Sequence, residues 1–491
     1  MDWKEEYRSK LISAEEAAKL IKSGDRVMVA GGSTDQPKIM KDAIFARRDE
    51  LMDVSILHFC PIKEPPWLEP GHEDHFRVEI TGFTSPIGRP SVAEKRTGFI
   101  PLAWDCTLKD FERANEHKII DWDLVTLSPP NKHGFCSLGP NLWIKKDYIR
   151  KAKRVIAEVD NNIQWFYGDT TIHISEIDYF VEHTPEIITD EDLINAIADI
   201  EPEEKRRKIE EYGKQILPQM RPMVLELFSL FDVATIDSFA DTIGLVPPKE
   251  AEAIAGYVNT LINSGDTFQI GQGSPSAYMH RFGAFDGKED LGYHGEMTAR
   301  GIGTMIKEGQ ITGKYKNFNQ YKSIFSSLDG MSPEELEYAS ENPLIEIYAT
   351  NWVTSIPIVA ANDNMVAIQN GISVDLTGQI TAETIFGSEP LNGPGGQPPS
   401  HIGALYSKGG RGITVLRSSA INGTVSCIVP QFDPGTVVTI ARCYADYIVT
   451  ENGIARLMGK TLRERAEELI SIAHPDFRSD LMKEAKRLFW P

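Results

Sequence analysis

The glutamate at position 296 stands where a side chain can be offered to a bound ligand. It follows the apolar stretch 291–294, which is typical of the end of a strand, and residues 297–307 after it favour a helix. In open α/β sheets, ligands bind at the carboxyl ends of the strands. The position therefore indicates a functional carboxylate at Glu296, beside Gly295, although an ordinary charge at the start of a helix gives the same pattern.

Glycine-rich segments near this glutamate have the composition of anion-binding loops. Residues 271–275 follow an expected strand, and their backbone N–H groups can surround a phosphate. A second run at 392–396 is followed by Lys408 and Arg411, whose charges suit a phosphate. Neither run is a dinucleotide fingerprint, and the sequence has no P-loop, which disfavours ATP-driven chemistry. Each run alone is explained by a turn; together they indicate a phosphate-bearing ligand.

The elements that must position these residues occur twice along the chain. A capping box at 13–16 predicts a helix, and a turn, a strand at 26–30 and a glycine loop follow it. A helix at 249–262, a turn, a strand at 267–270 and a glycine loop repeat this order. Residues 21–33 and 262–274 are identical at 6 of 13 positions. We interpret this as an internal duplication.

Further short apolar stretches, separated by helical ones, predict two similar, open, mostly parallel α/β domains. We expect a first domain at 1–190, a helical linker or insertion at 191–247, and a second domain at 248–491 that carries Glu296. The additional strands are expected at 54–57, 124–127, 155–159, 345–348, 365–368, 413–416 and 437–440.

The composition narrows the class of protein. The 51 Lys and Arg residues against 71 Asp and Glu residues give a net charge of −20, which disfavours a nucleic-acid partner. No apolar run approaches the roughly 20 residues of a membrane span, and the first residues lack a secretory signal. The five cysteines are scattered, so neither a disulfide framework nor a metal site is expected. These features are typical of a cytoplasmic protein.

Several long motifs resemble the class I coenzyme A transferases, specifically the acetyl-CoA hydrolase/transferase branch that includes 4-hydroxybutyrate CoA-transferases. The resemblance extends over nearly the whole chain, and its fold of two open α/β domains agrees with the duplication. The segments that carry it are 128–139, 168–173, 177–182, 290–297, 374–379, 407–411, 447–453 and 472–478.

The resemblance implies a role for each candidate residue. Glu296 matches the catalytic glutamate of the family, and Lys408 matches a contact to CoA. Gln369 aligns with an asparagine that helps to hold the oxyanion, and Asn370, the next residue, is the alternative. The backbone N–H groups at Gly395 and Gly396 are further candidate donors. The remaining implied CoA-binding residues are Gly271, Gln272, Gly273, Ser274, Pro275, Asn392, Gly395 and Gly396. The sequence departs from the family where Gln-Pro-Pro-Ser at 397–400 replaces an Asp-Phe pair.

The implied activity moves CoA from an acyl-CoA to a free carboxylic acid by a ping-pong mechanism through a glutamyl-CoA thioester on Glu296. CoA and acyl-CoA are then substrates, and no tightly bound cofactor is expected. An ordinary glutamate has a pKa of about 4.3, so we expect Glu296 to be ionised at neutral pH. The alternatives are an acyl-CoA hydrolase that uses the same glutamate and a non-catalytic CoA-binding protein. A homodimer is implied by the family; the acyl donor and acceptor are not.

Overall fold

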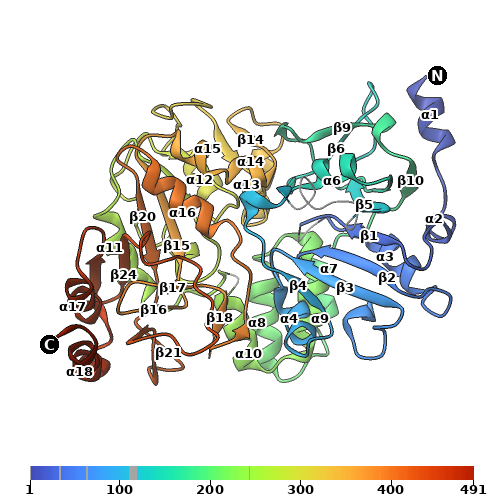
Figure 1. Ribbon diagram of the computed structural model, residues 1–491. Coiled ribbons are helices and arrows are strands. Elements are labelled where there is room, and N and C mark those ends of the chain that lie inside the picture. Colours follow the sequence, from blue (N-terminus) through green and yellow to red (C-terminus); the bar gives the residue numbers. More distant parts are fainter. Residues whose placement is uncertain (1, 33–34, 62–64, 110–118, 243, 386) are drawn as a thin grey trace.

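The computed structural model consists of two α/β halves that lie side by side, the N-terminal half on the right of Figure 1 and the C-terminal half on the left. It describes residues 2–32, 35–61, 65–109, 119–242, 244–385 and 387–491. Within these residues, no helix has the length and apolar character needed to cross a membrane.

The N-terminal half contains a sheet of seven strands, all parallel. The strands predicted at 26–30, 54–57, 124–127 and 155–159 are confirmed. The capping box is also confirmed, because Ser13 and Glu16 bond each other's backbone at the start of α2 (Ala14–Leu20). The strand order is β10 (Tyr179–Glu182), β7 (Arg154–Val159), β5 (Trp122–Leu127), β1 (Arg26–Val29), β2 (Val54–Phe59), β3 (Phe76–Thr81) and β4 (Gly98–Ile100).

The C-terminal half contains a six-stranded sheet that is parallel except for its last pair. The strands predicted at 267–270, 365–368 and 413–416 are confirmed. The strand predicted at 345–348 also forms, as β14 (Ile345–Ile347), but in a separate small sheet with β13 (Ser323–Phe325) and β8 (Tyr167–Gly168). The order of the large sheet is β12 (Gly292–Tyr293), β11 (Thr267–Ile270), β15 (Met365–Asn370), β20 (Arg411–Val415), β24 (Tyr447–Thr450) and β25 (Gly453–Arg456).

The strand predicted at 437–440 is wrong. Among the described residues this stretch makes only an isolated bridge between Ile440 and Ile380, and the strand that pairs with β20 is β24, further along the chain. Val437 and Val438 are 42% and 39% exposed, so their branched side chains lack the buried surface that makes such a run stable as a strand.

The duplication extends to the hydrogen bonds of the turn before the first strand of each half. Gly24 and Gly265 both have left-handed backbones, with φ of 84° and 83°. In the first turn, the Lys22 N–H donates to Asp25 at 2.8 Å. In the second, the Asn263 N–H donates to Asp266 at 2.7 Å. Of the last matched pair, Ser33 with Ser274, Ser33 lies outside the described residues.

Helices cover both faces of the C-terminal sheet. Apolar residues of α11 (Ala251–Asn259) belong to the cluster on one face, with Val366 and Ile368 of β15. On the other face, α15 (Ile356–Ala360) and α16 (Gln397–Tyr406) pack against Met365 and Ala367. The alternation of these four residues along β15 follows from the twofold side-chain period of a strand.

The segment between the two sheets is helical and has its own apolar cluster, which includes Leu193, Tyr212 and Phe228. Its helices are α7 (Asp190–Ala196), α8 (Glu203–Gly213), α9 (Arg221–Leu230) and α10 (Val233–Thr242). The division at 190 and 247 stays a prediction.

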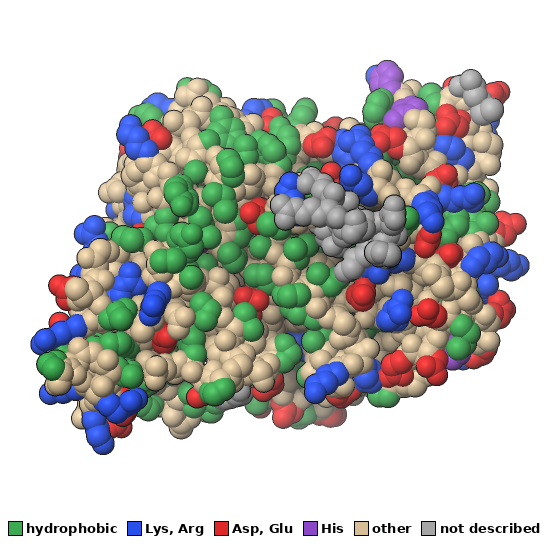
Figure 2. Space-filling view, viewed as in Figure 1, with side chains coloured by type: hydrophobic (Ala, Val, Ile, Leu, Met, Phe, Trp, Pro, Cys, Tyr) green, Lys and Arg blue, Asp and Glu red, His purple; other side chains and the backbone are tan. Residues whose placement is uncertain are grey.

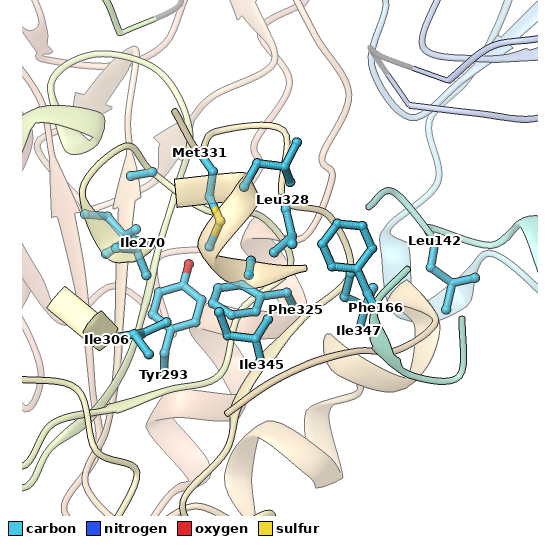
Figure 3. Close-up of a cluster of buried hydrophobic side chains, with 14 of the residues drawn as sticks. Leu142, Phe166, Ile270, Tyr293, Ile306, Phe325, Leu328, Met331, Ile345 and Ile347 are labelled. Carbon is cyan, nitrogen blue, oxygen red and sulfur yellow. The ribbon is translucent and has the colours of Figure 1, made fainter. Parts of the chain in front are cut away.

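The largest apolar cluster contains residues of both halves. Leu142 and Phe166 from the N-terminal half lie in it together with Ile270, Tyr293 and Phe325 from the C-terminal half (Figure 3). Each of these side chains is at least 95% buried. The two halves are therefore joined by a continuous core.

Candidate active site

Glu296 lies just beyond the carboxyl end of β12, and its backbone carbonyl is held by two consecutive residues. Its carbonyl oxygen accepts hydrogen bonds from the N–H groups of Ser326 at 2.8 Å and Ser327 at 2.9 Å. The helix predicted at 297–307 is shorter than expected, since α12 (Ile302–Lys307) begins only at Ile302. The reason is that Met297 bridges to Ser327, which keeps the chain extended after the glutamate.

The carboxyl group of Glu296 lies between Gly396 and the indole of Trp104. A Cβ atom placed on Gly396 would be 1.9 Å from the Glu296 carboxyl oxygen and 3.0 Å from the Trp104 ring. Burial raises the pKa of Glu296 to about 8, although hydrogen bonds from the Trp104 indole and the Gly396 N–H lower it. The expectation that Glu296 is ionised at neutral pH stays a prediction; it assumed a solvated side chain, whereas burial favours the neutral form.

Trp104 belongs to the other half of the molecule. It begins the 3₁₀ helix η2 (Trp104–Cys106), which follows β4. Its backbone N–H donates to the Gly395 carbonyl at 3.1 Å. The side chains of Thr84 and Arg89 hold the same loop, donating to the Leu391 carbonyl at 3.0 and 2.8 Å. The carboxyl ends of both sheets therefore meet around Glu296. Sequence analysis missed Trp104, since no motif marks it.

The structure brings the predicted loop at 271–275 next to this site. Gln272 donates to the carbonyl of Thr298, two residues after Glu296. The loop is held by Asn370, whose amide nitrogen donates to the Gln272 carbonyl at 2.6 Å and to the Ser276 hydroxyl at 2.7 Å. Its amide oxygen accepts from the Ser276 N–H at 3.0 Å. Both N–H groups of Asn370 are thus used to shape the loop.

Gln369 has a different surrounding. It is 6% exposed, and its amide nitrogen donates to the side-chain oxygen of Gln269 at 2.8 Å. A Cβ atom placed on Gly295 would lie 2.9 Å from Gln269, so the Gln269–Gln369 pair lies behind the glutamate. Of the two amides considered for the oxyanion, Gln369 is the one that does not hold the 271–275 loop.

The second predicted loop also lies at the site, at the start of α16. Gly395 and Gly396 contact Trp104, and the side-chain oxygen of Asn392 accepts the N–H of Gly393 at 2.9 Å. Pro398 and Pro399, which distinguish this sequence from the family pattern, occupy the first turn of α16.

Lys408 and Arg411 are not brought to Glu296. Lys408 lies before β20 and its carbonyl bonds the N–H of Asn364, just before β15, so it is at the amino edge of the sheet. The six residues of β15 separate this edge from the site by about 20 Å. Lys408 is 87% exposed and faces Asp363 at 3.8 Å, while Arg411 is paired with Asp266. The expected contacts of these two residues with a phosphate at the site are not supported.

The chain matches two family models. Residues 1–190 match the acetyl-CoA hydrolase/transferase N-terminal domain, and residues 332–485 match the acetyl-CoA hydrolase/transferase C-terminal domain. The two matches include Trp104, Gln369 and the loop at 392–396, whereas Glu296 lies between them.

Relatives extend over the full length. The 4-hydroxybutyrate coenzyme A transferase of Clostridium kluyveri is 32% identical over 100% of both chains. The succinyl-CoA:cyclohexane-1-carboxylate CoA transferase of Geobacter metallireducens is 31% identical, over 99% of this chain and 97% of the relative. The butyryl-CoA:acetate CoA-transferase of Anaerostipes caccae is 29% identical, over 99% and 98%.

Solved structures share the fold. The crystal structure of RipA from Yersinia pestis superposes with a TM-score of 0.80 at 26% identity, covering 100% of both chains. The 4-hydroxybutyrate CoA-transferase of Porphyromonas gingivalis gives 0.72 at 28% identity, over 99% of this chain and 100% of that one.

Proposed function

Because the chain belongs to the acetyl-CoA hydrolase/transferase family, we propose that it transfers CoA from an acyl-CoA to a free carboxylic acid. The observation that carries the proposal is the position of Glu296, whose carboxyl is held at the junction of the two halves by Gly396 and Trp104. A carboxyl that becomes covalently bound to one substrate before the next one reacts gives a ping-pong reaction.

In the proposed cycle, the ionised Glu296 attacks the acyl-CoA carbonyl and releases CoA thiolate, leaving a mixed anhydride. The thiolate then attacks the glutamyl carbonyl, which forms the glutamyl-CoA thioester and releases the first carboxylate. An incoming carboxylate attacks the thioester and reverses both steps. Each attack places a negative charge on a carbonyl oxygen, and the N–H of Gly396 and the amide of Gln369 are the proposed donors to it.

We assign the binding of CoA to the two loops at the carboxyl edge. The first comprises Gly271, Gln272, Gly273, Ser274 and Pro275, and the second contains Asn392, Gly395 and Gly396. The Ser274 hydroxyl is buried and has no hydrogen-bond partner among the described residues, which leaves it available to a ligand. Lys408 is left out of this assignment, because it lies at the opposite edge of the sheet.

The test is a transfer assay with one acyl-CoA donor and a panel of acids: acetate, butyrate, succinate, 4-hydroxybutyrate and cyclohexane-1-carboxylate. We expect a new acyl-CoA with at least one acceptor, and a CoA adduct in the intact mass after incubation with donor alone. Free CoA without a new thioester would instead support the hydrolase, which the family description also covers. Binding of CoA without turnover would support the non-catalytic alternative.

We also propose a homodimer. Apolar side chains gather on the face over α15 and α16 (Figure 2), where Tyr406 is 68% exposed. Light scattering after size exclusion tests this proposal, and a monomeric mass at micromolar concentration would contradict it.

A further inference from the structure

The ring of Trp104 is fixed from several directions although it belongs to the N-terminal half. It is 4% exposed and packs against Phe59, with ring centroids 4.9 Å apart, and against Trp143 at 5.6 Å. Gly82 leaves room for it, since a Cβ atom there would lie 2.1 Å from the ring. The backbone of Trp104 is bonded to Gly395. This packing fixes the direction of the indole N–H, which donates to the carboxyl of Glu296.

The start of α16 offers the carboxyl unusually few backbone donors. A helix normally begins with several free N–H groups that can bind an anion. Here Pro398 and Pro399 have no N–H, and the Gln397 N–H is bonded to the Pro394 carbonyl at 3.3 Å. Gly396 is thus the residue of this turn whose N–H bonds Glu296. A second donor to the same carboxyl has to come from outside the helix.

We propose that Trp104 is a positioning residue of the transfer reaction, whose indole N–H acts with the Gly396 N–H to hold one oxygen of Glu296 while the other attacks. The N-terminal half then completes the active site of the C-terminal half. The held oxygen is the carbonyl oxygen of the anhydride and of the thioester, so the two donors also face the charge that develops on it when thiolate attacks. This inference rests on the proposed function.

The proposal predicts an effect on the ionisation of Glu296. A donor stabilises the charged carboxylate, so its removal raises the pKa further. His294 and Tyr293 beside it are kept neutral, since burial lowers the pKa of His294 to about 3 and raises that of Tyr293. Burial likewise raises the pKa of Asp105, next to Trp104, and Cys106 is the remaining titratable neighbour in η2. None of these groups supplies a cation that would replace the indole.

The test compares Trp104→Phe with wild type in the full-length protein. We expect kcat to fall by about 10²-fold, the usual effect of removing one such donor, with KM for the acyl-CoA changed by less than about threefold. The pH at which kcat/KM reaches half of its maximum, which is set by the deprotonation of Glu296, should move to a higher value. Trp104→His, which restores a ring N–H, should recover part of the rate. Trp67→Phe is the matched control, because Trp67 is 2% exposed in the N-terminal half and its indole nitrogen has no hydrogen-bond partner in the described part of the chain.

Two outcomes separate this inference from the proposed function. The pKa of Glu296 is also obtained without turnover, from the pH dependence of the stability difference between each background and its Glu296→Gln variant. If wild type transfers CoA but Trp104→Phe matches Trp67→Phe in kcat and in this pKa, the role of Trp104 is overturned and the function stands. If wild type shows no transfer but the pKa rises in Trp104→Phe, the contact is supported and the function fails.

Discussion

The carboxyl group of Glu296 lies directly against the α-carbon of Gly396. Because a Cβ atom at that position would be 1.9 Å from the carboxyl oxygen, a residue with a side chain cannot occupy it without displacing the glutamate. The pair links the end of β12 to the start of α16, so that even one methyl group added at position 396 would displace the carboxyl group.

Gly396→Ala is therefore expected to lower kcat by about 10²-fold, the effect of moving a reacting group by about 1 Å. The matched control is Gly256→Ala in α11, where an added Cβ meets no atom of the described residues within 4 Å and alanine favours the helix. Steady-state kinetics of both variants check this, and equal activities would contradict the placement of the carboxyl.

Glu296→Gln should abolish transfer, with a loss of at least about 10³-fold, since removing a nucleophile usually costs more than that. The amide keeps the shape of the side chain but cannot form the anhydride. Intact mass spectrometry with an acyl-CoA donor should show a CoA adduct on the wild type and none on the variant. An adduct of equal yield on the variant would place the nucleophile elsewhere.

The rate should depend on pH through Glu296. With a pKa of about 8, most of the carboxyl is protonated at pH 7, so kcat/KM should rise nearly tenfold from about pH 6 to about 7 and level off above about 8. A profile that is flat between these values would show that the free enzyme already holds the carboxylate.

The same shift acts on stability with a defined sign. The folded pKa of Glu296 is raised above its ordinary value of 4.5, so the contribution of this group is fully present below that value and is lost as the pH rises towards about 8. The melting temperature of the wild type, relative to that of Glu296→Gln, should therefore fall over this interval. A difference that grows with pH would have the wrong sign.

Asn370→Ala should raise KM for the acyl-CoA by about tenfold, because the loop at 271–275 loses bonds worth about 1 kcal/mol each. Its effect on kcat should be smaller. Lys408→Ala, by contrast, should leave KM within about twofold of the wild type, since its exposed pair with Asp363 contributes little. A large rise in KM for Lys408→Ala would mean that CoA reaches the opposite edge of the sheet.

Sequence patterns were sufficient where the cause is local. The strand before each glycine loop, the repeated turn at Asp25 and Asp266, and the position of Glu296 after a strand all depend on neighbouring residues. The order of the elements was predicted for the same reason. The prediction of a strand at 437–440 was wrong because an apolar run forms a strand only where another surface buries it.

Other features of the site depend on contacts between distant parts of the chain. Trp104 reaches Glu296 only because two sheets meet at their carboxyl ends, and no spacing in the sequence encodes that meeting. The raised pKa of Glu296 likewise follows from burial between the halves. The place of Lys408 does follow from local sequence. A residue that precedes a strand of a parallel sheet lies at the edge opposite the carboxyl ends, and the family resemblance alone does not reveal this position.

The shared core of Figure 3 limits how this molecule can open. A hinge motion that separates the two halves would remove Leu142 and Phe166 from contact with Tyr293 and Phe325. The apolar surfaces would then be exposed to water, at a free-energy cost of about 25 cal/mol for each Å² exposed. We therefore expect no hinge between the lobes during turnover. Because the two halves share this core, either half produced alone would expose a large apolar surface and should aggregate.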